Sequence, residues 1–579
     1  MGTYFVKGDT YHQISETRFN QNQGHSNLGY ASRIPTEGGF LRKETLDTVN
    51  PAMISPKLEL RGVWVTTVRN TDFPSPSVFA NDSFDIDLFK QEYLRIVQHC
   101  KSLRLNAIFF QVRPEGDAFY PSQLNPWSQY LTGQQGLKPD WGDFDPLAWV
   151  IETTHSEGIE FHAWFNPYRL TPSIYSGATK ESLLELLSED NFARRHPELT
   201  YMFNGQLFLN PGIPEVNQFM ARTIREVLDH YHVDAIHLDD YFYPYSFQTQ
   251  VDDQLVFVSF ADESPDYETY LQYRQGDQTI NQWREYNINN LVYTLSRTVH
   301  RYNQEANKSV AFGISPFGIW ANAEETGGVG SQTSTSQLSS LNEYVNSKLW
   351  VDSGWLDYIA PQNYWSSNDP LSPFSIVAKW WDQVVEASAT QLYMGLGLYL
   401  YEEDANNPSW QNPEEIPNQI RYIRTLKNNK GYIFFTYHNL IPDRAQTTAL
   451  EQALYPIAEL QEDFSLVPPR KRLQAENTPP VNNLTISRGE DNFNLLTFED
   501  NPMGMSQYYV IYRVPGATDQ RIDISNANYI INVIGKMPGQ TIQIYTDDQA
   551  DPTKTYTYAV TALSQAQVES LPTSVVCRG

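Results

Sequence analysis

Two neighbouring aspartates, Asp239 and Asp240, follow a short apolar run and lead directly into the aromatic-rich sequence Tyr241–Tyr245. Two adjacent carboxylates repel each other, and burial would separate their pKa values. One carboxyl group can then hold a proton while the other stays anionic, which is the combination that cleaves a glycosidic bond. Such a pair can also simply begin a solvated loop, but the aromatic run favours a sugar subsite.

A further carboxylate, Asp117, follows an earlier apolar run. The neighbouring Arg113 would favour its ionised form, so the sequence predicts a positioning or base role. Glu115 is a weaker competitor, and Asp357 is expected to be structural because it begins its strand. Asp239, Asp240 and Asp117 are therefore the predicted catalytic residues, with Asp239 the first choice for nucleophile or charge stabiliser and Asp240 for the acid or an orienting group.

The elements that must position these residues are eight short apolar runs, which alternate with longer amphipathic segments. The runs are Leu60–Val68, Asn106–Val112, Glu160–Phe165, Ala235–Leu238, Val310–Ser315, Tyr358–Pro361, Leu392–Leu398 and Tyr432–Tyr437. Eight strands alternating with helices predict an α/β fold, a (β/α)8 TIM barrel. A doubly wound open sheet is the rival, but no Gly-rich phosphate loop follows the first run. About fifty residues follow the third run before its helix and about forty follow the fourth, which is typical of loops that build a substrate site.

Side chains along a strand alternate between its two faces, and the more uniformly aliphatic set should pack outward on the helices. On the fourth run this places Asp239 inward. The inward polar and aromatic residues, with those of the adjoining loops, give the predicted substrate-binding set, although a Gln or Asn among them can equally satisfy backbone groups. The set is Trp64, Gln111, Arg113, Trp164, Asn166, Tyr168, His237, Tyr241, Tyr243, Gln362, Tyr364, Trp365 and His438.

The chain divides into four predicted parts. Residues 1–57 form a polar lead-in, 58–462 the barrel, 463–480 a Pro-rich linker and 481–579 a small all-β, immunoglobulin-like sandwich. In the last part, short alternating runs at Asn494–Phe498, Gln507–Arg513, Thr541–Tyr545 and Thr555–Ala562 resemble a fibronectin type III module.

Composition narrows the classes of molecule that the chain is expected to bind. A net charge of -27 disfavours nucleic acid and anionic membrane surfaces, and no apolar stretch is long enough for a membrane span. Aromatic residues make up 13% of the chain, which leans towards a polysaccharide partner. Neither a protein partner nor a cofactor is predicted. Three inward histidines, His162, His237 and His438, offer only weak support for a metal, and a disulfide between Cys100 and Cys577 is improbable because they lie in different predicted domains.

Several segments together resemble a known family. They include Glu59–Thr67, Phe110–Pro114, Gly116–Tyr120, His162–Arg169, Leu209–Gly212, His237–Pro244, Gly313–Trp320 and Asp357–Trp365. In order along the chain they look like the family 10-like glycosyl hydrolase group of bacterial envelope proteins. The resemblance implies a TIM barrel that acts on glycans, and a relative of this kind cleaves peptidoglycan strands stripped of their stem peptides. The positions that match the family's polar mouth are Asp117, Asn166, Asp239, Asp240, Tyr243, Gln362 and Tyr364.

The sequence thus predicts a glycoside hydrolase acting on a bacterial amino-sugar glycan. Two alternatives stay open: a non-catalytic barrel that only binds glycans, and a metal-dependent deacetylase or hydrolase. The resemblance suggests the cell envelope or the extracellular space, although no signal peptide is visible in the polar N-terminal segment, so the compartment is left unassigned.

Overall fold

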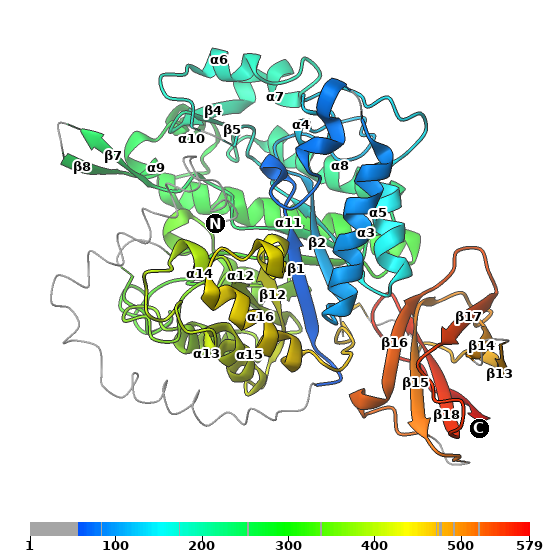
Figure 1. The fold of residues 1–579 in the computed structure, drawn as a ribbon. Helices are drawn as coiled ribbons and strands as arrows, with labels where there is room; N and C mark the ends of the chain where they lie inside the picture. The colour runs from blue at the N-terminus through cyan, green and yellow to red at the C-terminus, as the bar shows by residue number, and fades with distance from the viewer. Residues whose placement is uncertain are drawn as a thin grey trace.

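The computed structural model describes residues 56–578 apart from positions 83, 173, 252–253, 336–338, 471, 474–476, 490–492 and 519–521. Residues 1–55 of the predicted lead-in lie outside the described residues. Within the described part, no helix has both the length and the apolar character needed to cross a membrane. The chain forms a large barrel, and a smaller β-domain lies beside one end of it (Figure 1).

Eight parallel strands close into a barrel in the order β1-β12-β11-β10-β9-β6-β3-β2. The predicted TIM barrel is confirmed, and each strand overlaps one of the eight predicted runs. The strands are β1 (Leu60–Val65), β2 (Ala107–Arg113), β3 (Glu160–Phe165), β6 (Ala235–Leu238), β9 (Ala311–Ile314), β10 (Tyr358–Ile359), β11 (Gln391–Gly397) and β12 (Asn429–Phe435).

Helices follow the strands around the outside of the barrel (Figure 1). They are α3 (Ile86–Ser102), α5 (Pro146–Ser156), α8 (Pro214–His230), α11 (Ile280–Ala306), α12 (Ser347–Asp352), α13 (Phe374–Val384), α15 (Glu415–Arg424) and α16 (Thr448–Leu460). Local sequence fixes several starts: the side chain of Asp85 caps α3, Asp145 caps α5 ahead of Pro146, and Thr279 forms a capping box with Gln282 on α11.

The long connections after β3 and β6 contain structure that the sequence did not predict. The first holds α6 (Lys180–Glu185), α7 (Phe192–Arg195) and the hairpin of β4 (Thr200–Phe203) and β5 (Gln206–Leu209). The second holds the hairpin of β7 (Phe247–Val251) and β8 (Gln254–Val258), followed by α9 (Phe260–Glu263) and α10 (Tyr267–Tyr273). Both rise above the end of the barrel opposite the β-domain (Figure 1), together with α4 (Gln129–Thr132). The short α14 (Leu400–Glu403) follows β11.

The C-terminal domain consists of two antiparallel sheets, as the predicted sandwich requires. One sheet has the order β13-β14-β17 and the other β16-β15-β18-β19. The strands are β13 (Asn482–Arg488), β14 (Asn494–Glu499), β15 (Ser506–Pro515), β16 (Ile530–Gly535), β17 (Ile542–Asp547), β18 (Tyr556–Ser564) and β19 (Thr573–Cys577). The four predicted strands correspond to β14, β15, β17 and β18. The closer resemblance to fibronectin type III stays a prediction.

Candidate active site

Asp239 lies at the carboxyl end of β6, where active sites of TIM barrels are found. Its Oδ2 accepts hydrogen bonds from Trp164 Nε1 at 3.2 Å and Asn166 Nδ2 at 2.5 Å, both at the end of the adjacent strand β3. Its Oδ1 accepts from the backbone N–H of Tyr241 at 3.1 Å. Burial and the charge of Asp240 nevertheless raise the pKa of Asp239 to about 6. The group can therefore exchange a proton in mildly acidic water.

Asp240 is buried beside it and has its own donors. Its Oδ1 accepts from Gln362 Nε2 at 2.9 Å, and its Oδ2 accepts from the hydroxyl of Tyr245. Gln362 follows β10 and also donates to the backbone carbonyl of Ser315 at 2.9 Å, so it links the ends of two neighbouring strands to the carboxylate. The predicted cluster of Asp239, Asp240, Asn166 and Gln362 is thus brought together in one place.

Gln111 and Arg113 support this cluster from below. Gln111 Nε2 donates to Asn166 Oδ1 at 2.7 Å, which orients the amide that donates to Asp239. Its Oε1 accepts from the backbone N–H groups of Thr67 and Val68. Arg113 donates to the carbonyl of Asn166 at 2.6 Å and to Asn125 Oδ1 at 3.1 Å. Both side chains therefore hold neighbouring groups in position.

A second group of buried acids follows β2. Asp117 Oδ1 accepts from the backbone N–H of Glu115 at 3.0 Å, and burial raises the pKa of Asp117. Both oxygens of Glu115 lie 3.0 Å from the hydroxyl of Tyr130, and burial raises the pKa of Glu115 to about 8. None of the described hydrogen bonds joins Asp117 to Asp239 or Asp240. Asp117 therefore stands in a neighbouring cluster with Glu115.

Arg169 connects the two acidic clusters electrostatically. Its positive charge lowers the pKa of both Asp239 and Glu115, against the stronger effect of burial on each. Its Nε donates to the carbonyl of Pro114 at 3.1 Å, and the guanidinium lies 5.5 Å from the centre of the Tyr241 ring. Arg169 is a site residue that the sequence reasoning did not select, although it ends the recognised segment His162–Arg169.

Trp64 and His237 lie deeper, inside the barrel. Trp64 Nε1 donates to His237 Nε2 at 3.1 Å, and His237 Nδ1 lies 3.0 Å from the hydroxyl of Tyr358. Both are almost completely buried, and burial lowers the pKa of His237 well below its ordinary value. Their contacts are those of the packed barrel interior one layer below the aspartates. A substrate-binding role for them stays a prediction.

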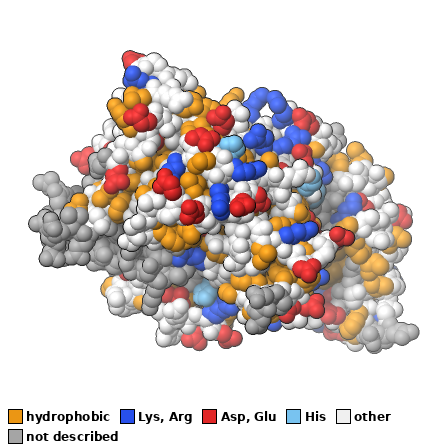
Figure 2. Space-filling view, turned by 90° about the horizontal axis from the view of Figure 1, so that it is seen from above, with side chains coloured by type: hydrophobic (Ala, Val, Ile, Leu, Met, Phe, Trp, Pro, Cys, Tyr) orange, Lys and Arg blue, Asp and Glu red, His pale blue; other side chains and the backbone are white. Residues whose placement is uncertain are grey.

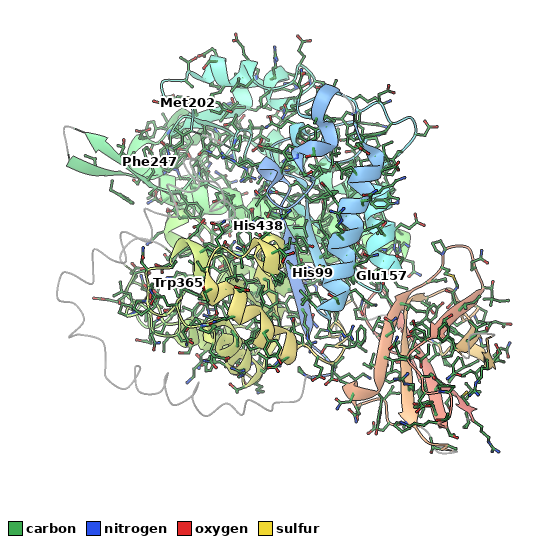
Figure 3. The ribbon with its side chains drawn as sticks, viewed as in Figure 1. His99, Glu157, Met202, Phe247, Trp365 and His438 are labelled. Carbon is green, nitrogen blue, oxygen red and sulfur yellow. The ribbon has the colours of Figure 1, made fainter. Side chains whose placement is uncertain are left out.

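The remaining predicted residues are divided between the mouth and its surroundings. The ring of Tyr364 stacks 5.8 Å from Phe435, and burial, with smaller effects from Tyr399, Asp240 and Asp239, raises the pKa of its hydroxyl. Trp365 is directed to the flank, where its ring meets Phe317 edge-on at 5.4 Å. Figure 3 shows Trp365 apart from His438, which lies after β12.

His438 belongs to a separate polar group that the sequence did not identify. Its backbone N–H donates to Asp72 Oδ1 at 2.7 Å, and Thr436 Oγ1 donates to the same oxygen at 3.1 Å. Asp72 Oδ2 accepts from the backbone N–H of Thr66 at 2.7 Å. Burial raises the pKa of Asp72 to about 6. Asp72 thus ties the ends of β1 and β12 together at the mouth.

Three predicted tyrosines come to lie in different surroundings. The Tyr241 ring lies beneath Arg169 and edge-on to Tyr245 at 5.6 Å, next to the aspartates. The Tyr168 hydroxyl instead donates to Asn217 Oδ1 on α8 at 3.1 Å. Tyr243 packs on Phe260 and Tyr344 and accepts a hydrogen bond from Asn287 on α11. Substrate contacts by Tyr168 and Tyr243 stay predictions, because both hydroxyls bond to side chains of the surrounding helices.

The three inward histidines do not meet at one point. His162 and His237 share the hydroxyl of Tyr358, whereas His438 lies at Asp72. Across the described residues, no three His, Cys, Asp or Glu side chains are grouped so that they could hold a metal ion. Cys100 and Cys577 are both free and buried.

Viewed from above, the surface over the barrel carries acidic and basic side chains close together, interspersed with apolar ones (Figure 2).

A family model described as glycosyl hydrolase-like 10 matches residues 59–412, which include every predicted site residue except His438. The chain belongs to the glycosyl hydrolase-like 10 family. The family resemblance and the predicted class, a glycoside hydrolase, are confirmed. The Asp239–Asp240 pair therefore lies within the part of the chain that matches this family.

The chain is similar to curated members of bacterial origin. Glycosyl hydrolase YngK of Bacillus subtilis (strain 168) is 36% identical over 518 residues, which cover 88% of this chain and 92% of that protein. Glycosyl hydrolase DigH of Escherichia coli (strain K12) is 32% identical over 384 residues, covering 65% of this chain and 82% of that protein. Among solved structures, the glycoside hydrolase domain of PgaB (BpsB) from Bordetella bronchiseptica aligns with a TM-score of 0.39 and 13% identity, over 71% of this chain and 100% of that domain.

Proposed function

We propose that this enzyme cleaves O-glycosidic bonds in an amino-sugar glycan, with peptidoglycan strands free of stem peptides as the first candidate substrate. The observation that carries the proposal is the buried pair of Asp239 and Asp240 at the end of β6, each with its own hydrogen-bond donors. Buried, mutually interacting carboxyl groups in a barrel mouth are typical of acid–base catalysis. The choice of an amino-sugar glycan rests on the family resemblance.

The pair can supply both groups that glycoside cleavage requires. While it holds one proton, one carboxyl group can protonate the leaving oxygen and the other can stabilise or attack the anomeric carbon. Because the pKa of Asp239 is raised to about 6, the singly protonated pair persists into mildly acidic solution. We therefore expect activity to be greatest below about pH 6 and to fall as the pH rises through that value.

The neighbouring residues position the substrate and the charges. Tyr241 and Tyr364 offer aromatic surfaces beside the pair, and Asn166 and Gln362 hold one carboxylate each. The alternative of a barrel that only binds glycans gives no reason for two buried carboxyl groups to be placed side by side, because burying like charges costs stability. The raised pKa of Asp239 therefore favours catalysis over simple binding.

The substrate can be tested with a panel of purified glycans at pH 5 to 6. We expect new reducing ends from peptide-free peptidoglycan strands, and fewer from intact peptidoglycan or cellulose. A double variant, Asp239→Asn with Asp240→Asn, serves as the blank, and Asp229→Asn on the exposed face of α8 is the matched control that should cleave like the wild type. Equal cleavage of cellulose and the peptide-free strands would contradict the amino-sugar assignment. Activity that persists up to about pH 8 before it falls would move the proton donor to Glu115, whose pKa is raised to about 8.

A further inference from the structure

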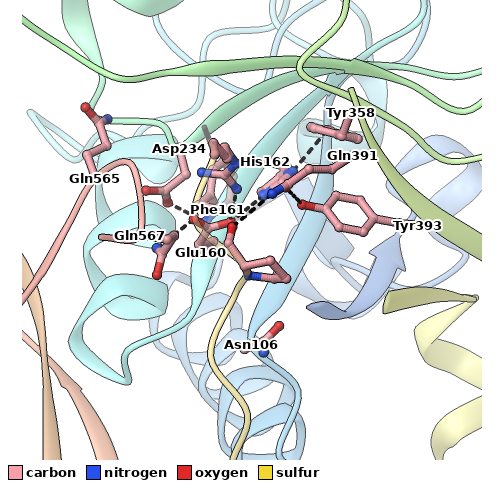
Figure 4. Close-up of polar contacts among 12 residues, drawn as sticks. Asn106, Glu160, Phe161, His162, Asp234, Tyr358, Gln391, Tyr393, Gln565 and Gln567 are labelled. Carbon is pink, nitrogen blue, oxygen red and sulfur yellow. Dashed lines mark hydrogen bonds and ion pairs between the residues drawn. The ribbon is translucent and has the colours of Figure 1, made fainter. Parts of the chain in front are cut away.

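Two carboxylates are buried at the opposite end of the barrel from the aspartate pair, and the sandwich contacts both. Glu160 is the first residue of β3, and Asp234 immediately precedes β6. Gln567 Nε2 donates to Glu160 Oε1 at 2.7 Å, and Gln507 Nε2 donates to Asp234 Oδ1 at 2.7 Å. Figure 4 shows Gln567 against Glu160, with Asp234 and His162 close by. The C-terminal domain thus supplies donors to acids that the barrel buries.

The segment that joins the two domains adds a charge to the same place. Arg470 is buried, and its Nη2 forms an ion pair with Glu160 Oε2. From β15 of the sandwich, the hydroxyl of Tyr508 donates to the carbonyl of Ile159 at 3.2 Å and to Asp234 Oδ2 at 3.3 Å. A buried carboxylate is costly unless it is paired and hydrogen-bonded. These two acids therefore take part of their pairing from residues beyond the barrel, in addition to His155 and His162 within it.

The backbones of the two domains also touch without intervening side chains. A Cβ added at Gly158, after α5, would lie 2.4 Å from the carbonyl oxygen of Val533. A Cβ added at Gly535, at the end of β16, would lie 2.0 Å from the carbonyl oxygen of His155. Figure 3 shows Glu157 at the end of α5 nearest the sandwich. A contact this close is typical of a domain docked in one position and not of one on a flexible tether.

From Glu160 a hydrogen-bonded chain runs into the barrel. His162 Nε2 lies 2.9 Å from Glu160 Oε2, and His162 Nδ1 lies 3.0 Å from the hydroxyl of Tyr358. That hydroxyl lies 3.0 Å from His237 Nδ1. Gly313 on β9 leaves the space for the Tyr358 ring, because a Cβ there would lie 2.1 Å from it. The chain therefore crosses the interior between β3, β10 and β6.

Trp64 fixes the direction of every bond in this chain. Its indole N–H can only donate, so His237 Nε2 must accept and His237 Nδ1 must carry the proton. The Tyr358 hydroxyl then accepts from His237 and donates to His162 Nδ1, which leaves His162 Nε2–H to donate to Glu160. Burial lowers the pKa of both histidines, in keeping with neutral rings. One arrangement of protons therefore satisfies all of these groups.

The chain ends next to the aspartate pair. His237 Nε2 also lies 3.1 Å from Ser315 Oγ, and the carbonyl of Ser315 accepts from Gln362, which donates to Asp240. Asp239 follows His237 by two residues on the same strand. Glu160 begins β3 and Asp234 precedes β6, so the sandwich holds both strands at these ends, and Asn166 and Asp239 directly follow the other ends.

We propose that the C-terminal sandwich is a positioning element of the active site. By holding Glu160 and Asp234 it fixes strands β3 and β6, and so sets the positions of Asn166 and Asp239 in the mouth. Gln507 and Gln567 are the positioning residues. The inference rests on the proposed role of Asp239 for its effect on catalysis, but its effect on the strands can be measured independently.

The test uses the full chain with Gln507→Ala and Gln567→Ala together. The matched control is Gln540→Ala with Gln549→Ala, two exposed glutamines of the sandwich, the second of which donates to Asp548 of the same domain. Amide hydrogen exchange is measured over residues 160–166 and 234–240, together with kcat and KM on a glycan that the wild type cleaves. We expect amide exchange to become about tenfold faster and kcat to fall about tenfold in the interface variant, with KM within about twofold. Residues that support an active site from behind commonly have effects of this size. The control should match the wild type.

Faster exchange confined to residues 158–161 and 233–235, with kcat unchanged, would overturn the inference. If the wild type cleaves no glycan, the proposed function fails, and the exchange at residues 163–166 and 237–240 still decides whether the sandwich fixes the strands. Expression and melting of the interface variant are checked first. If it does not fold, the single variant Gln567→Asn, which keeps the amide but shortens its reach, replaces it.

A second variant, Tyr358→Phe, leaves the interface intact and interrupts the chain of histidines. In the wild type, nitrogen NMR of labelled histidine should show His237 protonated at Nδ1 and His162 at Nε2. The variant should alter both signals and lower kcat about threefold or more through its effect on the second layer of the site. Unchanged histidine signals and unchanged kcat would overturn the part of the inference that runs through these rings.

Discussion

The two ends of this barrel bury carboxylates in opposite ways. At the mouth, burial raises the pKa of Asp239 to about 6 and that of Glu115 to about 8. At the base, burial acts in the same direction on Asp234, but His155 and the Phe161 N–H outweigh it and lower the pKa to about 2. Burial raises the pKa of Glu160 as well, but pairing with Arg470 and His162 outweighs burial and lowers it overall.

The acids at both ends of the barrel are buried, so the direction in which the pKa shifts is decided by the groups that each acid is paired with. Each acid at the base of the barrel has a cationic or imidazole partner of its own: His155 for Asp234 and Arg470 for Glu160. The mouth acids lie beside other acids and share the influence of Arg169. Carboxyl groups that retain protons near neutrality suit proton transfer, whereas those held ionised suit structure. Both ends can therefore be tested by removing one partner at a time.

The largest expected effect is on activity at the mouth. Asp240→Asn removes half of the pair, and we expect kcat to fall about a hundredfold to ten-thousandfold, the usual range for loss of a general acid or base. The melting temperature should stay the same or rise, because a buried like charge is removed. Steady-state kinetics and thermal unfolding measure the two. A loss of activity that accompanies a lower melting temperature would instead make Asp240 structural.

At the base, the expected effect is on stability. Arg470→Met leaves the Glu160 carboxylate buried without its cation, and we expect a loss of about 3 to 5 kcal/mol in the free energy of unfolding. Adding Glu160→Gln removes the unpaired charge, so the double variant should recover much of that loss. Denaturant unfolding of the single and double variants gives the coupling. If Glu160→Gln makes Arg470→Met worse, the ion pair is not what stabilises the base.

A smaller effect is expected on the pH dependence of stability, which should differ between the acids at the two ends of the barrel. The lowered pKa of Asp234 means that its contribution to stability is present above about pH 4 and is lost as the pH falls towards 2. The destabilisation by Asp234→Asn, about 2 kcal/mol at pH 6, should therefore shrink over that range.

The raised pKa of Glu115 acts with the opposite sign. The folded chain holds this proton more tightly than the unfolded chain, so Glu115 costs stability as the pH rises from about 4.5 to 8. Glu115→Gln should gain on the wild type over that range by about 1 kcal/mol or more. Denaturant midpoints of wild type and variant between pH 4 and 8 measure this. Parallel midpoints would show that the pKa of Glu115 is not raised.

The barrel could be predicted from the sequence because each strand is an apolar run of its own, and alternation along it is local information. The same alternation placed Asp239 and Asn166 inward, and their hydrogen bond confirms that they meet. The alternation does not show how deep a side chain lies in the barrel. His237 has the same orientation as Asp239 but lies in the layer beneath it. The alternation also ends with the strand, which is why Tyr168 and Tyr243 in the loops turned out to contact helices.

The base of the barrel was missed for a different reason. Gln507 and Asp234 are far apart in the chain, and nothing local in either residue indicates the other. The predicted linker holds Arg470, which looks like a solvated charge in a Pro-rich segment but is buried against Glu160. The hairpin of β4 and β5 was missed because its strands are four residues each, too short for a clear alternation.

The central claim is that the aspartate pair at the mouth performs the glycosidic cleavage, and one variant tests it most directly. Asp239→Asn keeps the shape of the side chain and removes its charge and its proton. Release of reducing ends from peptide-free peptidoglycan strands should fall about a thousandfold or more at pH 5.5, while binding of the strands is retained. Release within a few-fold of the wild type would contradict the claim.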